Sequence, residues 1–316
     1  MLPRTYFLAF LVLLALLPHV LYPVFLMQLL CMALFACAFN LLLGYTGLLS
    51  FGHAAFLGGS AFIAGQAAKV WGLPIELSIL AGTLTGTLLG VGFGLIAIRK
   101  QGIYFAMITL ALAQMVFFYA LKAPFTGGED GLQSIPRSNL FGIIDLTHEV
   151  TMYYFILALF LAGFLIIFRI IHSPFGQILK SIRENEDRAI SLGYRVDRYK
   201  LAAFIISAAL SGLAGSMKAM VSQVVSLSDV HWSMSGTVVL MTLIGGTGTL
   251  FGPIVGAAII VSMEHYLGEY LGSWVTIIMG VIFVICVLTF RQGVVGELEQ
   301  RLIKRKLPFQ SQDSTS

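Results

Sequence analysis

His53 is the residue best placed to do chemistry in the first third of the chain, because it stands in a run of almost uncharged sequence. Between positions 5 and 98, the other charged or imidazole side chains are His19, Lys69 and Glu76. An imidazole among apolar residues can bind a polar solute or pass a proton. A neutral histidine that hydrogen-bonds a neighbouring helix fits the sequence equally well, and both interpretations stay open at this point.

Two glycine-rich segments interrupt the apolar sequence, one at positions 44–53 and one at 245–253, and both contain the pattern Thr-Gly-x-Leu. Paired breaks in two hydrophobic segments point to a translocation site. A broken helix frees backbone amides and carbonyls, which can bind a polar solute where they line a cavity. Close helix packing is the alternative role for these glycines. The expected substrate pathway comprises Asn40, Gly44, Tyr45, Thr46, Gly47, Ser50, His53, Gly245, Gly246 and Gly248.

The middle of each long apolar run lacks carboxylates, since Asp229, Glu264 and Glu269 stand near the ends of the expected helices. Carriers coupled to protons or sodium usually have such groups at membrane depth. The sequence therefore favours another energy source and leaves an ion-coupled secondary carrier as an alternative. The histidines show no metal-ligand spacing, so we expect neither a metal site nor an enzyme active site.

A basic connection follows in the second half of the chain, with seven Lys or Arg residues between Arg169 and Lys200. Ser173 and Pro174 suit the start of a helix, and Gly193 suits its end. We therefore predict one rigid amphipathic helix over Pro174–Leu192. Its polar face mixes acidic and basic residues, which suits a protein partner better than an anionic lipid surface. Its expected apolar face comprises Phe175, Ile178, Leu179, Ile182, Ala189 and Ile190.

The elements that must position these residues are membrane helices. Apolar residues make up 58% of the 316 residues and charged residues only 11%, whereas soluble domains average about 25% charged. The apolar runs are continuous rather than alternating and have the length that a bilayer needs. The sequence predicts an all-α polytopic membrane protein forming a single transmembrane domain over residues 1–316. We interpret the first apolar run as a membrane helix and not as a signal peptide.

Loop charges predict the topology. The connection 122–150 carries two basic and four acidic residues, so it is expected outside, as a periplasmic loop. The loop 172–200 and the tail 291–316 are basic and are expected in the cytoplasm. Both termini can be cytoplasmic only if the segment 235–263 is broken at its glycines, which gives about ten membrane segments, two of them broken or re-entrant. The other spans are expected near 5–22, 25–43, 48–68, 77–98, 103–121, 151–169, 201–221 and 273–290.

A stripe of glycines recurs every fourth residue at Gly82, Gly86, Gly90 and Gly94. Small residues at this spacing let helix backbones approach closely. We expect this stripe to serve packing, either within the chain or against a second membrane subunit.

Several blocks of sequence resemble one family. The segment 173–193, followed by Tyr199-Lys200-Leu201, resembles the cytoplasmic coupling loop of branched-chain amino acid ABC permeases, and most closely that of the LivM branch. The segments 40–56, 102–106, 126–132 and 245–253 are similar to the same family in the same order. The resemblance therefore covers most of the chain.

The resemblance implies an ABC importer permease fold in the inner membrane of a bacterium. It also implies partners: two ABC ATPase subunits, a homologous second permease subunit, a periplasmic substrate-binding protein and the lipid bilayer, with no nucleic acid. The chain has no P-loop sequence, so we expect it to bind no cofactor and the partner subunits to use ATP. Residues expected to couple to the ATPase are Arg183, Glu184, Asn185, Arg188 and Gly193.

The substrate that the resemblance implies is a branched-chain or related amino acid, delivered by the binding protein. Permeases for urea or short amides share much of the same signature, so these solutes are the alternative.

Overall fold

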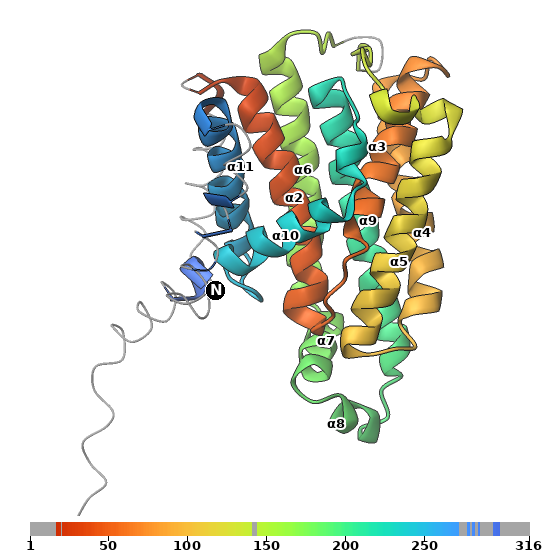
Figure 1. Ribbon diagram of the computed structural model, residues 1–316. Coiled ribbons are helices and arrows are strands. Elements are labelled where there is room, and N and C mark those ends of the chain that lie inside the picture. The colour runs from red at the N-terminus through yellow and green to blue at the C-terminus, as the bar shows by residue number, and fades with distance from the viewer. Residues whose placement is uncertain are drawn as a thin grey trace, which may run out of the picture.

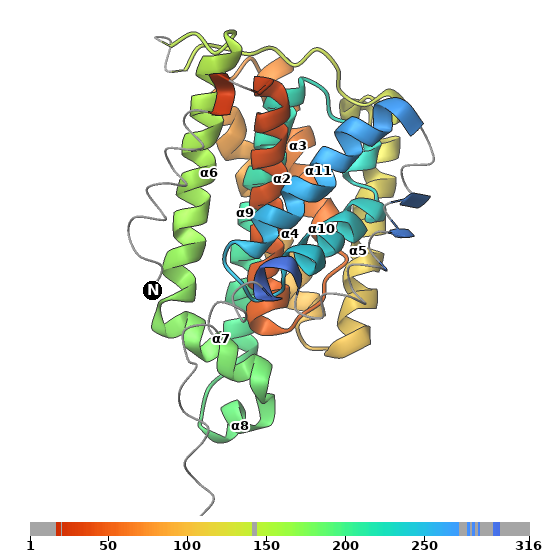
Figure 2. The same cartoon turned by 90° about the vertical axis from the view of Figure 1, so that its left-hand side faces the viewer.

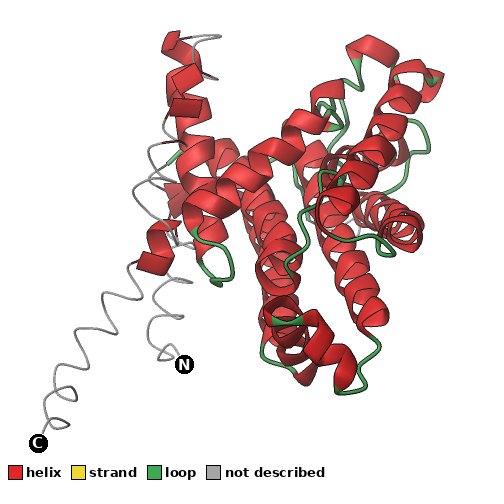
Figure 3. Ribbon diagram, turned by 60° about the horizontal axis from the view of Figure 1, so that its bottom comes forward, coloured by secondary structure: helices red, strands yellow, loops and turns green. Residues whose placement is uncertain are grey.

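The computed structural model describes residues 17–19, 21–140, 144–271 and short stretches at 277–278, 280–281, 284 and 293–297. Within these residues the chain is helical, and extended pairing is limited to isolated bridges at Leu132–Val225 and Leu140–Ile144 (Figure 3). The expected spans 5–22 and 273–290 and the tail 291–316 lie wholly or largely outside the described residues.

Long helices and short helices alternate along the chain. Five described helices, α2, α4, α5, α6 and α9, are long and apolar enough to cross a membrane. The elements in chain order are η1 Leu17–His19, α2 Pro23–Thr46, α3 His53–Lys69, α4 Ile75–Ala97, α5 Gly102–Lys122, η2 Pro124–Thr126, η3 Gly128–Asp130, α6 Glu149–Ile171, α7 Pro174–Glu184, α8 Glu186–Ser191, α9 Val196–Ser222, η4 Leu227–Asp229, α10 Trp232–Gly245 and α11 Gly252–Leu271. The all-α polytopic fold is confirmed, and the number of ten segments stays a prediction.

The helices form an upright bundle with α2 and α9 at its centre (Figure 1). The connection between α5 and α6 lies at one end, and α7 and α8 lie at the other, here called the α7 end (Figure 1). The acidic connection 122–150 and the basic loop 172–200 are thus on opposite ends of the bundle. This separation agrees with the opposite sidedness that the charges predict.

The glycine stripe of α4 packs against α3 and α9 within the same chain. A methyl group added at Gly86 would lie 2.6 Å from the Ser60 hydroxyl oxygen and 2.8 Å from the Gly212 Cα. A methyl group at Gly82 would collide with the Ser216 hydroxyl. The packing role that the spacing predicts is therefore confirmed within the chain.

Two short helices begin inside the bundle rather than at its ends. Helix α3 starts at His53, and residues 47–52, which connect α2 to α3, are not helical. Helix α10 starts at Trp232, after residues 223–231 have left the end of α9. Its 14 residues span about 21 Å, which is less than a hydrocarbon core about 30 Å thick.

The predicted break in the segment 235–263 is confirmed, because residues 246–251 separate α10 from α11. The two helices pack against each other and against α2 (Figure 2). The far end of α11 reaches the start of α2, where the rings of Phe25 and His265 lie 4.9 Å apart. Gly293 lies against Gly246, so the chain has returned to the α7 end by residue 293.

Candidate functional site

The two glycine-rich segments meet at the α7 end of the bundle, through Asn40 of α2. The Asn40 side-chain amide donates from Nδ2 to the Thr249 carbonyl (2.8 Å), and its Oδ1 accepts from the Gly248 amide (2.9 Å). One side chain thus satisfies a donor and an acceptor of the connection 246–251, which has no regular structure to satisfy them. The sequence placed Asn40 and Gly248 in one pathway without showing that they touch.

Helix α7 packs beside this contact between α2 and the connection 246–251. The Arg183 guanidinium donates from Nη1 to the Gly44 carbonyl, which belongs to the last turn of α2, where carbonyls lack partners within the helix. The Lys180 ammonium lies 5.7 Å from the centre of the Tyr45 ring, within the range of a cation–π contact. Residues expected to couple to an ATPase and residues expected to line the pathway are therefore in direct contact.

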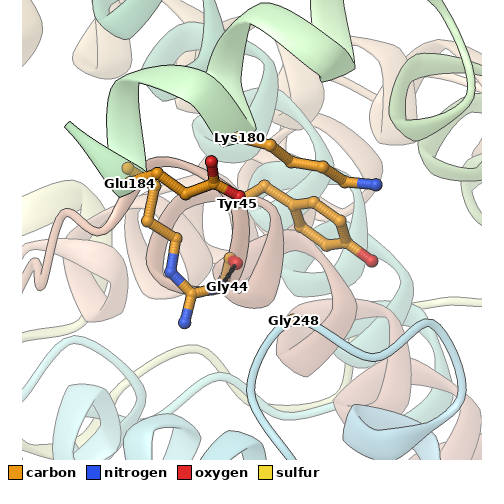
Figure 4. A pocket seen from close by; sticks show the side chains of 6 residues that line it. Gly44, Tyr45, Lys180, Glu184 and Gly248 are labelled. Atoms are coloured by element: carbon orange, nitrogen blue, oxygen red, sulfur yellow. Dashed lines mark hydrogen bonds between the residues drawn. The ribbon is translucent and has the colours of Figure 1, made fainter. Parts of the chain in front are cut away.

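A cavity of about 390 Å³ opens at this junction, a size typical of small-molecule sites. In Figure 4, Lys180 and Glu184 project from α7 toward the Tyr45 ring. The charged groups come from α7, while the glycines come from α2 and the connection 246–251. The lining residues are Gly44, Tyr45, Lys180, Arg183, Glu184 and Gly248.

The remaining residues of this junction shape the backbone. Gly47 ends α2 with a positive φ of 75°, and a methyl group there would lie 3.4 Å from the Cγ of Arg183. The Thr46 hydroxyl donates back to the Leu42 carbonyl of its own helix. Gly245 packs against the Gly252 carbonyl where α10 meets α11, and Gly246 follows with a φ of 118°. These positions hold the two breaks in shape, and a role in the pathway stays a prediction for them.

His53 lies apart from this junction, near the middle of α2 and α9. Its side chain is fully buried, its Nε2 lies 2.9 Å from the Ser207 hydroxyl, and that hydroxyl donates to the Ala38 carbonyl (2.6 Å). The hydroxyl hydrogen is thereby used, so we assign the imidazole proton to Nε2. The Phe39 ring packs edge-on at 4.9 Å. The geometry matches a histidine that bonds neighbouring helices, and a place in the substrate pathway stays a prediction for it.

Hydroxyl groups that the sequence analysis did not single out hold the start of α3. The Ser235 hydroxyl accepts from the Ala54 amide (2.9 Å) and donates to the Phe51 carbonyl (2.8 Å). The Thr109 hydroxyl accepts from the Phe51 amide (3.2 Å). The Ser50 hydroxyl of the expected pathway accepts from the Gly52 amide (3.1 Å) within the same break. A single serine or threonine in an apolar helix gives no sequence signal for such a role.

The prediction of one rigid helix over Pro174–Leu192 is wrong, because the chain forms two helices there. Helix α7 ends at Glu184 and α8 begins at Glu186. Asn185 between them has extended backbone angles, and its side chain accepts from the Arg188 amide (2.9 Å). The Asn185 side chain caps the start of α8, which competes with the continuation of α7 through this residue. This competition explains the break.

The break also divides the expected apolar face. Leu179 and Ile182 are buried as predicted, whereas Ile190 is 54% exposed. Arg188 and Leu192 are exposed beside it, and Gly193 ends this segment with a φ of 86°. The expected coupling residues thus fall into two groups, with Arg183 and Glu184 at the cavity and Arg188 and Gly193 at the exposed tip formed by 188–194.

Helix α8 is fastened to α9 and to the connection between α4 and α5. The Glu186 carboxylate pairs with the Lys200 ammonium (2.6 Å) at the start of α9 and accepts from the Gln101 side-chain amide (2.9 Å) between α4 and α5. Both helices pack on α9 through the cluster of Ile182, Ala189 and Val196, and α7 also contacts α2.

Comparison with known proteins identifies the family. Residues 23–287 match the family described as the permease component of the branched-chain amino acid transport system. The chain belongs to this family. The LivM-type resemblance is thereby confirmed over most of the chain.

Named relatives agree with this assignment. The proteins named high-affinity branched-chain amino acid transport system permease protein LivM from Salmonella typhimurium and Escherichia coli are each 26% identical over 277 residues, covering 80% of this chain and 65% of the relative. The match thus spans less than two thirds of the length of these relatives. The autoinducer 2 import system permease protein LsrC of Klebsiella pneumoniae is 26% identical over 193 residues, 58% of this chain and 53% of the relative. No solved structure gives a significant match.

Proposed function

We propose that this chain is the membrane-spanning permease subunit of an ATP-driven importer. The observation that carries the proposal is the α7–α8 element at the basic end of the bundle. It exposes a tip with Arg188, Ile190 and Leu192 and contacts both glycine-rich segments through Arg183, at Gly44 and at Gly248. An importer driven by separate ATPases needs an element that joins a docking surface to the moving part of the pathway.

In the proposed mechanism, a periplasmic binding protein delivers the solute at the end that carries the connection 122–150. Two ABC ATPase subunits bind at the α7 end, and a homologous second permease completes the pathway. ATP binding and hydrolysis in the partners displace the tip around Arg188. Helix α7 passes this displacement to the end of α2 and to the connection 246–251, whose backbone groups then change the exposure of the pathway. This chain binds no cofactor in the scheme.

The proposed solute is a branched-chain or related amino acid. The family and the two LivM relatives support this class. LsrC is named for the import of autoinducer 2, which supports a wider range of small polar solutes among related chains. Urea and short amides stay the alternative, and the bacterial inner membrane with both termini in the cytoplasm is the proposed location.

The proposal is tested by purification of the tagged chain from its native membrane with and without the charge reversal Arg188→Glu. The unchanged chain should retain two ATPase subunits, and Arg188→Glu should lose them while still inserting into the membrane. Lys122→Glu, a charge reversal at the opposite end, is the matched control and should retain them. A chain that purifies without any ATPase and transports under an imposed ion gradient would be a secondary carrier instead.

A further inference from the structure

The contacts of Asn40 and Arg183 join three elements that are far apart in the sequence. Asn40 bonds the connection 246–251 to α2, and Arg183 bonds α7 to Gly44, one turn further along α2. We propose that this Asn40–Arg183 junction makes α7, the last turn of α2 and the connection 246–251 move as one unit during transport. The inference rests on the proposed function and assigns Asn40 and Arg183 as positioning residues inside the permease.

The packing at the junction leaves little room for independent movement. A methyl group at Gly44 would lie 2.6 Å from the Gly248 amide nitrogen, and a methyl group at Gly248 would lie 2.9 Å from the Arg183 Nη1. Gly248 also has a φ of 78°, which glycine adopts without strain. The backbones of α2 and the connection 246–251 are therefore in contact, with the guanidinium directly beside them.

The direction of the Arg183 side chain separates this role from docking. Both arginines are exposed, but the Arg183 guanidinium bonds a carbonyl of α2, whereas Arg188 lies on α8. Asn185 between them is a break in the helix. The route from Arg188 to α2 and to the connection 246–251 therefore runs through α7 and Arg183. Helix α8 itself is held to α9 by the Glu186–Lys200 ion pair.

Substitution of Asn40 removes the hydrogen bonds between α2 and the connection 246–251 without changing α7. Alanine at this position removes the donor to Thr249 and the acceptor for Gly248 and leaves every residue of α7 unchanged. The connection 246–251 then loses its side-chain tie to α2, while the docking tip is intact. The expected consequence is ATP hydrolysis that no longer drives transport.

The first experiment measures distances in the complete importer with its ATPase subunits. Spin labels at Ser181→Cys on α7 and Thr247→Cys in the connection report on the junction, with Cys31, Cys37 and Cys286 replaced by alanine. The distance between these labels should stay within about 2 Å with and without ATP. The distance from 181 to a label at the exposed Ile103→Cys of α5 should change between the same states. A change of about 5 Å or more between 181 and 247, or no change in either pair, would overturn the inference.

The second experiment compares Asn40→Ala with Arg188→Ala in the reconstituted importer. Asn40→Ala should keep its ATPase subunits and lower the solute imported per ATP hydrolysed by about tenfold. Asn40→Asp keeps the acceptor for Gly248 and should recover part of that ratio. Arg188→Ala should instead weaken the binding of the ATPase subunits. Asn40→Ala with an unchanged ratio contradicts the inference.

The outcomes separate this inference from the proposed function. If the unchanged chain shows no transport driven by ATP, the proposed function fails. If it transports and Asn40→Ala transports with the same ratio, only the junction fails. If Asn40→Ala does not assemble, the spin-label distances in the otherwise unchanged chain decide whether the junction moves as one unit.

Discussion

Two irregular segments, here called breaks, lead into short helices: residues 47–52 lead into α3 and residues 223–231 lead into α10. Different interactions hold them in place. Residues 47–52, which lead into α3, are held by uncharged hydroxyls such as those of Ser235 and Thr109. Residues 223–231, which lead into α10, are held by the ion pair of Lys218 with Asp229. The Val225 backbone also pairs with Leu132 in the connection between α5 and α6.

The depth of each break explains the difference. The first break reaches His53, near the middle of α2 and α9, where a charge would be costly to bury. The second begins at the end of α9, where Arg137 donates to the Val221 carbonyl (2.7 Å) from the connection 122–150. Lys218 stands one turn before that end of α9, and the buried Asp229 carboxylate also accepts from the Ser226 amide (3.2 Å). We infer that the deep break depends on hydrogen-bond satisfaction and the outer break on charge pairing.

Loss of the ion pair should have the largest effect on stability. Asp229→Ala removes the carboxylate that pairs with Lys218 and the acceptor for the Ser226 amide, so we expect a loss of about 3 kcal/mol. Thermal unfolding of the purified protein in detergent measures the loss. Asp130→Ala, an exposed aspartate in the connection between α5 and α6, is the control and should match the unchanged chain. Equal melting temperatures for both variants would show that the outer break does not need charge.

Loss of the Ser235 hydroxyl should have the next largest effect. Ser235→Ala leaves the Ala54 amide and the Phe51 carbonyl without this partner in a buried place, at a cost of about 2 kcal/mol. Thr237→Ala is the matched control, because that hydroxyl bonds the Ser233 carbonyl of its own helix and no other group among the described residues. The same unfolding measurement should place Ser235→Ala clearly below Thr237→Ala. Identical values would mean that the deep break is held by packing alone.

Loss of the cap between α7 and α8 should have the smallest effect. Asn185→Ala removes the side-chain acceptor for the Arg188 amide and should cost about 1 kcal/mol. Asn185→Asp keeps the acceptor and should restore the stability. Hydrogen exchange of the amides in 186–191 measures the effect locally, and equal protection in all three proteins would argue against the cap.

The membrane helices and the break at 246–251 could be predicted from the sequence, because apolar length, glycine content and loop charge are local properties. The split at Asn185 was missed, since the helix signals at Ser173 and Gly193 bracket a longer segment and the Asn185 cap is a single side chain. The roles of Asn40 and Ser235 depend on partners about two hundred residues away. Such contacts follow from the tertiary packing and leave no periodicity in the sequence.

The central claim is that this family member imports its solute with energy from partner ATPases. The most direct test is uptake of labelled leucine into proteoliposomes that contain the complete importer and its binding protein, with the α7 end facing an ATP supply. Uptake should require ATP, should persist without any ion gradient and should exceed uptake of urea. Uptake that continues without ATP and follows an imposed ion gradient would contradict the account.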